Sequence, residues 1–300
     1  MSGPATEPAV REATGSHGRP RRRRLLKRVA VVVVACTVVP TLFLYLTQDQ
    51  LIYGPVQHTP PIGTVLPGGE EVSYRTRDGV DVRSWFLPAT PSASAARAPS
   101  PVAIVFHGTH GERSSMAPFA QELARHGVAV LLAEYRGFGD VEGALSEQGL
   151  HEDALAAVTY VQSRPDLDPS HIAYVGYSLG TGVAVSLSVV RPPAALVLLA
   201  PYTSLPDVAW SSLPGLPYRL LMRTQFDSRS RIGRLHVPLL VVRGSADRTI
   251  PPEQSAEVFA IANEPKQLLT IDGADHDLRA PGAPSTASAT LQFLSSLGGV

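Results

Sequence analysis

From residue 102 to the C-terminus, the sequence alternates between short apolar runs and longer segments with helical spacing. The apolar runs are rich in Val, Ile, Leu and Ala, and the first is VAIVFHG at residues 102–108. The segments between them, such as MAPFAQELARHG at residues 116–127, place apolar residues on one helical face. Continuous apolar strands separated by amphipathic helices are typical of a mostly parallel sheet with helices on both faces. The sequence therefore predicts an α/β fold for this region.

The other predicted elements follow in a regular order. Strands are expected at 128–135, 172–177, 195–201, 238–244 and 266–271, and helices at 151–164, from 178, at 252–263 and at 285–297. Before the alternation begins, EEVSYRTRDGVDVRSWFLP alternates apolar and polar residues around Asp78-Gly79, which predicts a β-hairpin. The small-residue stretch at residues 88–101 is expected to be an exposed loop.

An uncharged apolar run, VAVVVVACTVVPTLFLYL, occupies residues 29–46. Its length is near the lower limit for a membrane-spanning helix, and it is apolar all round, whereas a buried core helix is usually amphipathic. A block of Arg and Lys precedes the run, and no Lys or Arg follows it until Arg75. By the positive-inside rule, we expect a cytoplasmic N-terminus and an extracytoplasmic domain after the run.

We expect three parts: a disordered basic tail at 1–24, a transmembrane signal anchor at 25–47 and a domain at 48–300. Two other export signals remain as alternatives. RRRLLK resembles a twin-arginine signal without its preceding Ser or Thr, and VVAC, ending at Cys36, resembles a lipoprotein site. An uncleaved anchor is favoured because no small-x-small cleavage site follows the run. Cys36 is the only cysteine, so the domain has no disulfide.

Overall charge gives no reason to expect a nucleic-acid partner, because 26 basic residues balance 26 acidic ones. Functional groups of an open parallel sheet collect at the carboxyl ends of its strands. Ser178 follows the strand at 172–177, in the frame Gly-Tyr-Ser-Leu-Gly, where the strand breaks sharply into a helix. This position is typical of a nucleophilic serine, and a serine that merely caps the helix is the alternative.

A base and an acid for Ser178 also lie at strand ends. Only three of the nine histidines, His107, His110 and His276, occupy such positions. His276, beyond the last strand, is expected to act as general base, because a free serine hydroxyl is a poor nucleophile. Asp247, after the penultimate strand, would orient the imidazole, and the order Ser-Asp-His is that expected of this sheet type. The rival acids are Asp227, Asp272, Asp275 and Asp277.

An oxyanion site needs two backbone N–H groups that point at the developing charge. We expect one from Leu179, the residue after the nucleophile, and the other from Thr109, in the turn after the first parallel strand. His107 is expected to have a structural role. A metal site is not expected, because the histidines at the strand ends lack the His-x-x-x-His spacing of hydrolytic zinc sites. No cofactor is needed for acyl transfer by such residues.

Several longer stretches resemble the α/β-hydrolases, and more closely the membrane-anchored α/β-hydrolase-domain (ABHD-type) proteins, which are grouped with serine aminopeptidase-like hydrolases. The matching stretches are QDQLIYGP, FHGTHGE, EYRGFGDVEG, YVGYSLGTGVA, APYTSLPDVA, FDSRSRI, VPLLVVRGSADRTIPP and GADHDL. The resemblance implies an α/β-hydrolase fold with Ser178 as nucleophile, Asp247 as acid and His276 as base. The chain departs from the family at Thr109 and at Asp277, where Asn is usual. We expect the Asp277 carboxylate to shift the pH optimum upward.

The substrate is less constrained by the sequence. Residues 202–233 occupy the lid position of this family and are too few for a large helical cap. Candidate substrate-binding residues for a small or lipid-like acyl ester are Trp210, Leu213, Leu216 and Tyr218, and packing against the core is the alternative role. No residue marks a trap for a substrate amine, so ester or thioester hydrolysis is favoured over aminopeptidase activity. A catalytically silent binding module is the alternative from another functional class.

Overall fold

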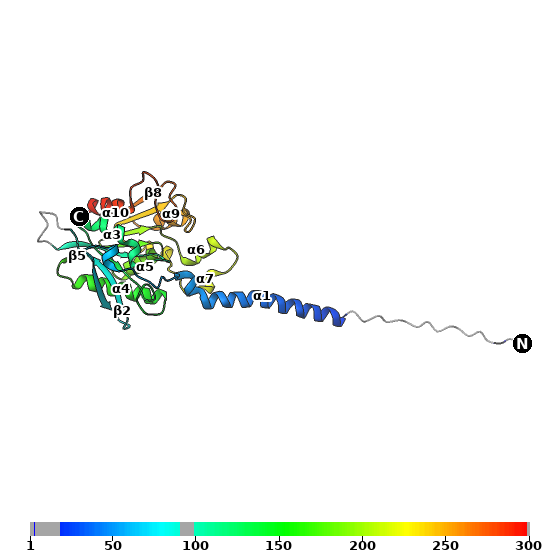
Figure 1. The fold of residues 1–300 in the computed structure, drawn as a ribbon. Coiled ribbons are helices and arrows are strands. Elements are labelled where there is room, and N and C mark those ends of the chain that lie inside the picture. Colours follow the sequence, from blue (N-terminus) through cyan, green and yellow to red (C-terminus); the bar gives the residue numbers. More distant parts are fainter. Residues whose placement is uncertain (1–2, 4–18, 91–98, 299–300) are drawn as a thin grey trace. The chain divides into compact units, whose positions relative to one another are not determined.

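The computed structural model describes residue 3, residues 19–90 and residues 99–298 (Figure 1). Most of the basic tail predicted at residues 1–24, and the middle of the loop predicted at residues 88–101, therefore lie outside the described residues. The chain divides into two structural units, Met1–Thr47 and Gln48–Val300.

The long helix α1 (Arg19–Tyr53) begins in the basic block, continues through the apolar run and contains Pro40. Its segment Arg24–Tyr53 is long and apolar enough to cross a membrane, by length and composition. Large apolar side chains of this segment, such as Val31 and Phe43, are mostly exposed. A helix that is apolar all round and buries little against protein is stable where lipid covers it.

The second unit is built on one eight-stranded sheet with the order β1-β2-β4-β3-β5-β6-β7-β8. Its strands are β1 (Glu70–Arg75), β2 (Asp81–Leu87), β3 (Ser100–Phe106), β4 (Ala129–Ala133), β5 (Leu167–Tyr177), β6 (Ala195–Leu199), β7 (Leu239–Gly244) and β8 (Lys266–Ile271). The predicted hairpin is confirmed as β1 and β2, and β2 pairs antiparallel with β4. The other six strands, in the spatial order β4, β3, β5, β6, β7 and β8, pair in parallel with their neighbours. This arrangement confirms the predicted fold class.

Helices cover both faces of this sheet. They are α2 (Ile62–Val65), the 3₁₀ helix η1 (Arg113–Met116), α3 (Ala117–Arg125), α4 (Glu147–Ser163), α5 (Leu179–Val190), α6 (Leu205–Ser212), α7 (Tyr218–Leu221), α8 (Ser228–Ile232), α9 (Pro252–Ile261) and α10 (Thr286–Ser296). In Figure 1, α3 and α10 lie together on one side of the sheet, and α4 lies on the other.

Two apolar cores result from the alternation of side chains along the buried strands. In β3, Ile104 and Phe106 pack in the core beneath α4 and α5, whereas Ala103 and Val105 pack in the core beneath α3 and α10. A strand that is buried on both faces must be apolar at every position, which is why these runs do not alternate with polar residues. The same burial fixes the register, because a shift by one residue would exchange the two faces.

Arg136, in the loop after β4, joins three parts of the second unit. Its guanidinium donates to Asp153 of α4 at 2.8 Å and to Asp78 in the turn between β1 and β2 at 2.9 Å. The side chains of Arg136 and Asp153 are almost completely buried, whereas Asp78 is about half exposed. Two carboxylates therefore satisfy this buried cation, and the pairing holds the hairpin turn against the parallel part of the sheet.

Candidate active site

Ser178 lies on a sharp turn between β5 and α5. Its backbone has φ 51° and ψ −119°, a combination with positive φ that non-glycine residues rarely adopt. A Cβ on Gly180 would lie 2.6 Å from the Phe106 carbonyl carbon, and one on Gly176 would lie 2.6 Å from Thr181 Cα. Only glycine fits these two positions, so the Gly-x-Ser-x-Gly frame is required by packing. Backbone strain held in place by such packing is concentrated at functional sites.

The side chain of Ser178 does not cap the helix that it precedes. Ser178 occupies the position before the first residue of α5, but its hydroxyl makes no capping hydrogen bond. Instead, the hydroxyl oxygen lies 2.9 Å from Nε2 of His276. The backbone carbonyl of Ser178 accepts from the Thr181 N–H at 2.9 Å. The alternative of a purely capping serine therefore does not describe this residue.

His276 is held between Ser178 and an acid by contacts on both its side chain and its backbone. Its Nδ1 lies 2.9 Å from Oδ2 of Asp247. The Tyr177 hydroxyl donates to the His276 carbonyl at 3.1 Å, and the Asp275 carboxylate accepts from the His276 N–H at 2.8 Å. With the Nδ1 proton donated to Asp247, the Nε2 lone pair faces the serine hydroxyl, which is the tautomer a general base requires.

Asp247 is the one acid among the five candidates that hydrogen-bonds the imidazole. It is buried, and its second oxygen, Oδ1, accepts from the N–H groups of Thr249 and Ile250, both at 2.8 Å. These bonds fix the orientation of the carboxylate, because both of its oxygens are engaged.

The four other candidate aspartates do not hydrogen-bond the His276 imidazole. Asp275 is exposed, and the backbone N–H groups of Arg248 and His276 hold its pKa below the usual value. Asp227 accepts from the Ser230 N–H at the start of α8. Asp272 is exposed. Asp277 is also exposed and accepts from the Arg279 N–H, so solvent screens its charge, and the upward shift of the pH optimum stays a prediction.

Two backbone N–H groups beside Ser178 are available for an oxyanion. Leu179 is the first residue of α5, where N–H groups have no partner within the helix. Thr109 follows Gly108, at which a Cβ would lie 3.0 Å from the Ser178 Cβ, so this turn passes directly beside the serine. Among the hydrogen bonds of the described residues, neither the Leu179 nor the Thr109 N–H donates to a protein acceptor.

Below this turn, His107 has a structural environment, as the sequence predicts. The imidazole is fully buried, with Nδ1 2.8 Å from the Gly108 carbonyl oxygen and Nε2 2.6 Å from Oε1 of Glu134. Oε2 of Glu134 accepts from the Arg113 N–H. Glu134 is not among the residues predicted from the sequence, although a carboxylate directly after an apolar strand is a usable signal. Within the described part of the chain, no cluster of three or more His, Cys, Asp or Glu residues is arranged to hold a metal ion.

The four candidate substrate-binding residues lie on or between α6 and α7. Trp210 and Leu213 are mostly exposed, whereas Leu216 and Tyr218 are half-buried. Trp210, Leu216 and Tyr218 line a cavity of about 190 Å³ inside the lid itself. Across the described residues, no hydrogen bond or ring contact joins these four side chains to the serine, the aspartate or the histidine. Their role in substrate binding stays a prediction.

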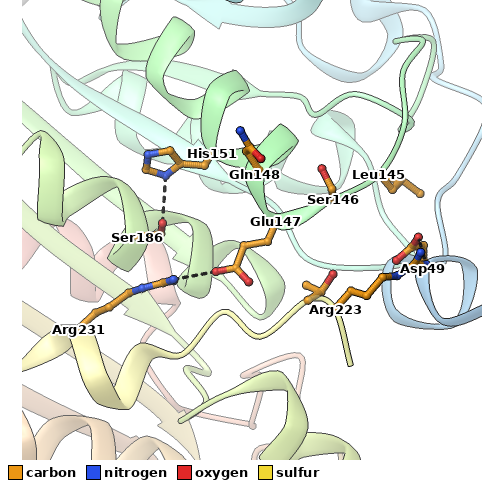
Figure 2. A pocket seen from close by; sticks show the side chains of 10 residues that line it. Asp49, Leu145, Ser146, Glu147, Gln148, His151, Ser186, Arg223 and Arg231 are labelled. Atoms are coloured by element: carbon orange, nitrogen blue, oxygen red, sulfur yellow. Dashed lines mark hydrogen bonds and ion pairs between the residues drawn. The ribbon is translucent and has the colours of Figure 1, made fainter. Parts of the chain in front are cut away.

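A second pocket, of about 530 Å³, lies at the start of α4. Figure 2 shows the side chains that line it. It contains another Ser-His pair, because Oγ of Ser186 lies 3.0 Å from Nδ1 of His151, and burial lowers the His151 pKa. Ser186 lies within the regular helix α5 rather than on a strained turn. Of the described residues, no carboxylate hydrogen-bonds the other nitrogen of His151. The Ser186–His151 pair therefore lacks both the turn and the acid of the Ser178 site.

Comparisons with known proteins place the chain in a family. A family profile described as serine aminopeptidase, S33, matches residues 97–222. An uncharacterized protein of Mycobacterium tuberculosis is 41% identical over 261 residues, which cover 86% of this chain and 90% of that protein. The chain belongs to the α/β-hydrolases. The ABHD-type resemblance is also confirmed, because human Protein ABHD12B is 30% identical over 62% of this chain and 58% of its own length.

The fold of this α/β-hydrolase is also similar to that of solved structures. The Pyrococcus furiosus esterase Pf2001 superposes with a TM-score of 0.64 at 18% identity, over 81% of this chain and 96% of that protein. At this identity the similarity concerns the fold.

Proposed function

We propose that this α/β-hydrolase is a serine hydrolase that transfers the acyl group of an ester or thioester to water. The observation that carries the proposal is the chain of hydrogen bonds from Ser178 through His276 to Asp247, with both links at 2.9 Å. It is supported by the strained backbone of Ser178 and by the free N–H groups beside it. A serine with a base, an orienting acid and an oxyanion site has the parts that acyl transfer requires.

In the first half-reaction, Ser178 Oγ attacks the substrate carbonyl carbon while His276 Nε2 accepts the hydroxyl proton. The Asp247 carboxylate stabilises the imidazolium that forms. The N–H groups of Leu179 and Thr109 donate to the carbonyl oxygen as it becomes negatively charged. His276 then gives the proton to the departing alkoxide or thiolate. The carbon–oxygen or carbon–sulfur bond breaks, an alcohol or thiol leaves, and the acyl group stays on Ser178.

In the second half-reaction, water takes the place of the departed alcohol or thiol. His276 removes a proton from the water as its oxygen attacks the acyl carbon, and the same two N–H groups stabilise the oxyanion. Collapse of the intermediate breaks the bond to Ser178 Oγ, which recovers the proton from His276. The products are a carboxylic acid and the free enzyme, and no cofactor takes part.

Peptidase activity is the alternative, and the matching serine aminopeptidase profile favours it. An aminopeptidase must hold the substrate ammonium group, which a carboxylate without another partner does best. Both acids of the lid at residues 202–233 are engaged. Asp207 pairs with Arg219 at 3.0 Å and with Arg229 at 3.2 Å, and Asp227 caps α8. Ester hydrolysis is further supported by the esterase name of the Pyrococcus structure.

We further propose that α1 tethers the enzyme to a membrane as a signal anchor, with residues 48–300 outside the cytoplasm and a lipid-like acyl ester as substrate. Support comes from the apolar segment Arg24–Tyr53 and the basic residues before it. Cys36, the only cysteine, lies within the apolar run, so an exposed Ser295→Cys thiol can report the topology. A membrane-impermeant maleimide should label this variant in intact cells and should not label the wild type. Labelling only after lysis would contradict the proposed orientation.

The reaction class is tested by substrates presented to the full chain in detergent. A series of p-nitrophenyl esters of increasing acyl length, acyl thioesters and aminoacyl naphthylamides should be assayed with wild type and Ser178→Ala. We expect ester or thioester turnover by the wild type only. Turnover confined to aminoacyl amides would support the peptidase alternative. Absence of turnover on every substrate by a folded wild type would support a catalytically silent binding module.

A further inference from the structure

The lid carries an exposed apolar surface at its tip. We define this surface, the lid apex, by Trp210, Leu213 and Leu220, whose exposed fractions are 52%, 60% and 85%. Trp210 of α6 and Leu220 of α7 line the same small cavity, so these two side chains adjoin one another, and Leu213 directly follows α6. Exposed tryptophan and leucine side chains cost free energy in water, and clusters of exposed apolar side chains mark contact surfaces.

The lid is fastened to Gln48–Tyr53, the part of α1 that belongs to the second unit. The buried side chain of Gln48 accepts from the Arg223 N–H at 2.7 Å and donates to the Leu221 carbonyl at 3.5 Å. Asp49 pairs with the Arg223 guanidinium at 2.6 Å. Tyr53 and Thr224 hydrogen-bond through their hydroxyls at 3.2 Å. The segment directly after α7 is therefore bound to the residues that directly follow the apolar run.

The C-terminal part of the lid, residues 225–231, which we call the lid base, is also bound to α4. Glu147, at the start of α4, accepts from the N–H groups of Gln225 at 2.8 Å and Phe226 at 2.9 Å. Its other oxygen accepts from Arg231 of α8 at 2.9 Å, and Figure 2 shows this ion pair. These bonds fix the lid base against α4. The lid apex is therefore carried by a segment that is bound to the rest of the second unit.

The depth of the apex relative to a membrane follows from chain connectivity. The apolar run ends at Leu46, and Thr47, Gln48 and Asp49 are polar. In a chain tethered through this run, the water–lipid boundary lies where the run ends. Gln48 bonds the carbonyl of Leu221, which follows Leu220 in α7. The apex is therefore held close to that boundary, where tryptophan side chains are enriched in membrane proteins.

We propose that the lid apex inserts into the interfacial layer of the same bilayer that α1 crosses, as a second membrane contact of the enzyme. This inference rests on the membrane tethering in the proposed function. Trp210 lies at headgroup level, where its amphipathic ring is stable, and Leu220 reaches toward the acyl chains. The lid is then in contact with lipid, and acyl substrates dissolved in the bilayer reach it without crossing water.

The two tryptophans of the chain allow a direct test. Trp85 is fully buried in the core, whereas Trp210 is mostly exposed. The full chain should be reconstituted into phosphatidylcholine vesicles with and without acyl-brominated phosphatidylcholine. We expect the brominated lipid to quench part of the emission and aqueous iodide to quench less than it does in detergent. Trp210→Phe, which leaves only Trp85, should lose the component that brominated lipid quenches.

A charged variant gives a second readout. Leu220→Asp places a carboxylate on the apex and should abolish quenching by brominated lipid, with an unchanged far-ultraviolet spectrum. Equal quenching of wild type and Trp210→Phe, or full access of iodide to Trp210 in vesicles, would overturn the proposal. The wild-type result does not depend on how any variant folds. Ser178→Ala should lose hydrolysis and keep the quenching, so this inference and the proposed activity fail independently.

Discussion

Gly180 lies directly against Phe106, so that a Cβ at position 180 would approach the Phe106 carbonyl carbon to 2.6 Å. Phe106 ends β3 and Gly180 is the second residue of α5, so this approach sets how closely the helix starts over the sheet. The atoms that this Cβ would meet, in Phe106 and His107, all belong to the backbone and cannot move aside. The turn that carries Ser178 therefore requires a glycine at position 180, two residues further along the chain.

Gly180→Ala should distort this turn. The methyl group would displace either α5 or β3, and overpacking against backbone should destabilise the enzyme by about 1–3 kcal/mol. Thermal unfolding of the variant in detergent measures this cost, and ester turnover should be lost in parallel. Gly63→Ala is the control, because nothing lies within 4 Å of its added Cβ. If Gly180→Ala were as stable and active as Gly63→Ala, the close approach of Gly180 to the Phe106 backbone would be contradicted.

Asp247→Asn should lower kcat by about 10⁴ and leave the fold intact. The amide oxygen can still accept from Thr249 and Ile250, but the amide N–H₂ then faces Nδ1 of His276 and selects the wrong tautomer. Steady-state kinetics on the best ester measures the loss. Asp272→Asn, at an exposed rival acid, should change kcat by less than about twofold, in the range of surface substitutions. Comparable losses in the two variants would remove Asp247 from the proposed role.

Tyr177→Phe should lower the rate by a factor that is constant across pH. The hydroxyl donates to the His276 carbonyl, and loss of one such bond corresponds to about a twofold to tenfold decrease. Burial raises the Tyr177 pKa to about 12, so the hydroxyl remains a donor throughout the working range. A pH–rate profile from pH 6 to 10 tests this expectation. A ratio of wild-type to variant rates that changes steeply below pH 10 would contradict it.

The Arg136–Asp78 pair predicts a specific pH dependence of stability. Hydrogen bonds from Arg136 hold the pKa of Asp78 well below its usual value. A carboxyl whose pKa is lower in the folded state stabilises the fold above its unfolded pKa, about 3.9, and this contribution is lost as pH falls through the folded value. Asp78→Asn should therefore destabilise at pH 7, by no more than about 1 kcal/mol because the carboxylate is half exposed.

The difference between wild type and Asp78→Asn should shrink as pH falls below about 4. Denaturant unfolding at several pH values measures it. Asp81→Asn, on the next strand of the same hairpin, removes only an exposed pair with Arg75 and should have a smaller effect at pH 7. A stability difference for Asp78→Asn that stays constant down to pH 2 would contradict the assigned ion pair.

The sheet and the strand-end positions of the site could be predicted because they depend on local patterns. An apolar run such as residues 102–106 identifies a buried strand by itself, and Ser178, Asp247 and His276 are each recognisable by the strand that they follow. The hydrogen bonds between them join residues 29 and 98 positions apart, so the sequence could place them at one edge but could not give their geometry.

Other features of the site depend on contacts between residues far apart in the sequence, which a local sequence pattern does not reveal. The pairing of His107 with Glu134 joins the ends of different strands, and neither residue shows it alone. The lid helices are short, and their base is set by bonds from Glu147 to Phe226, 79 positions away. The positive φ of Ser178 is likewise imposed by tertiary packing of Gly176 and Gly180, although the motif indicated a strained turn.

The central claim is that Ser178 is an activated nucleophile, and a fluorophosphonate probe tests it most directly. The full chain, Ser178→Ala and Ser186→Ala should be labelled in detergent under identical conditions. Ser186 is the matched control, because it is also paired with a histidine, at 3.0 Å, but lies inside a regular helix. We predict that wild type and Ser186→Ala are labelled equally and that Ser178→Ala is not labelled. Undiminished labelling of Ser178→Ala, or no labelling of a folded wild type, would contradict the claim.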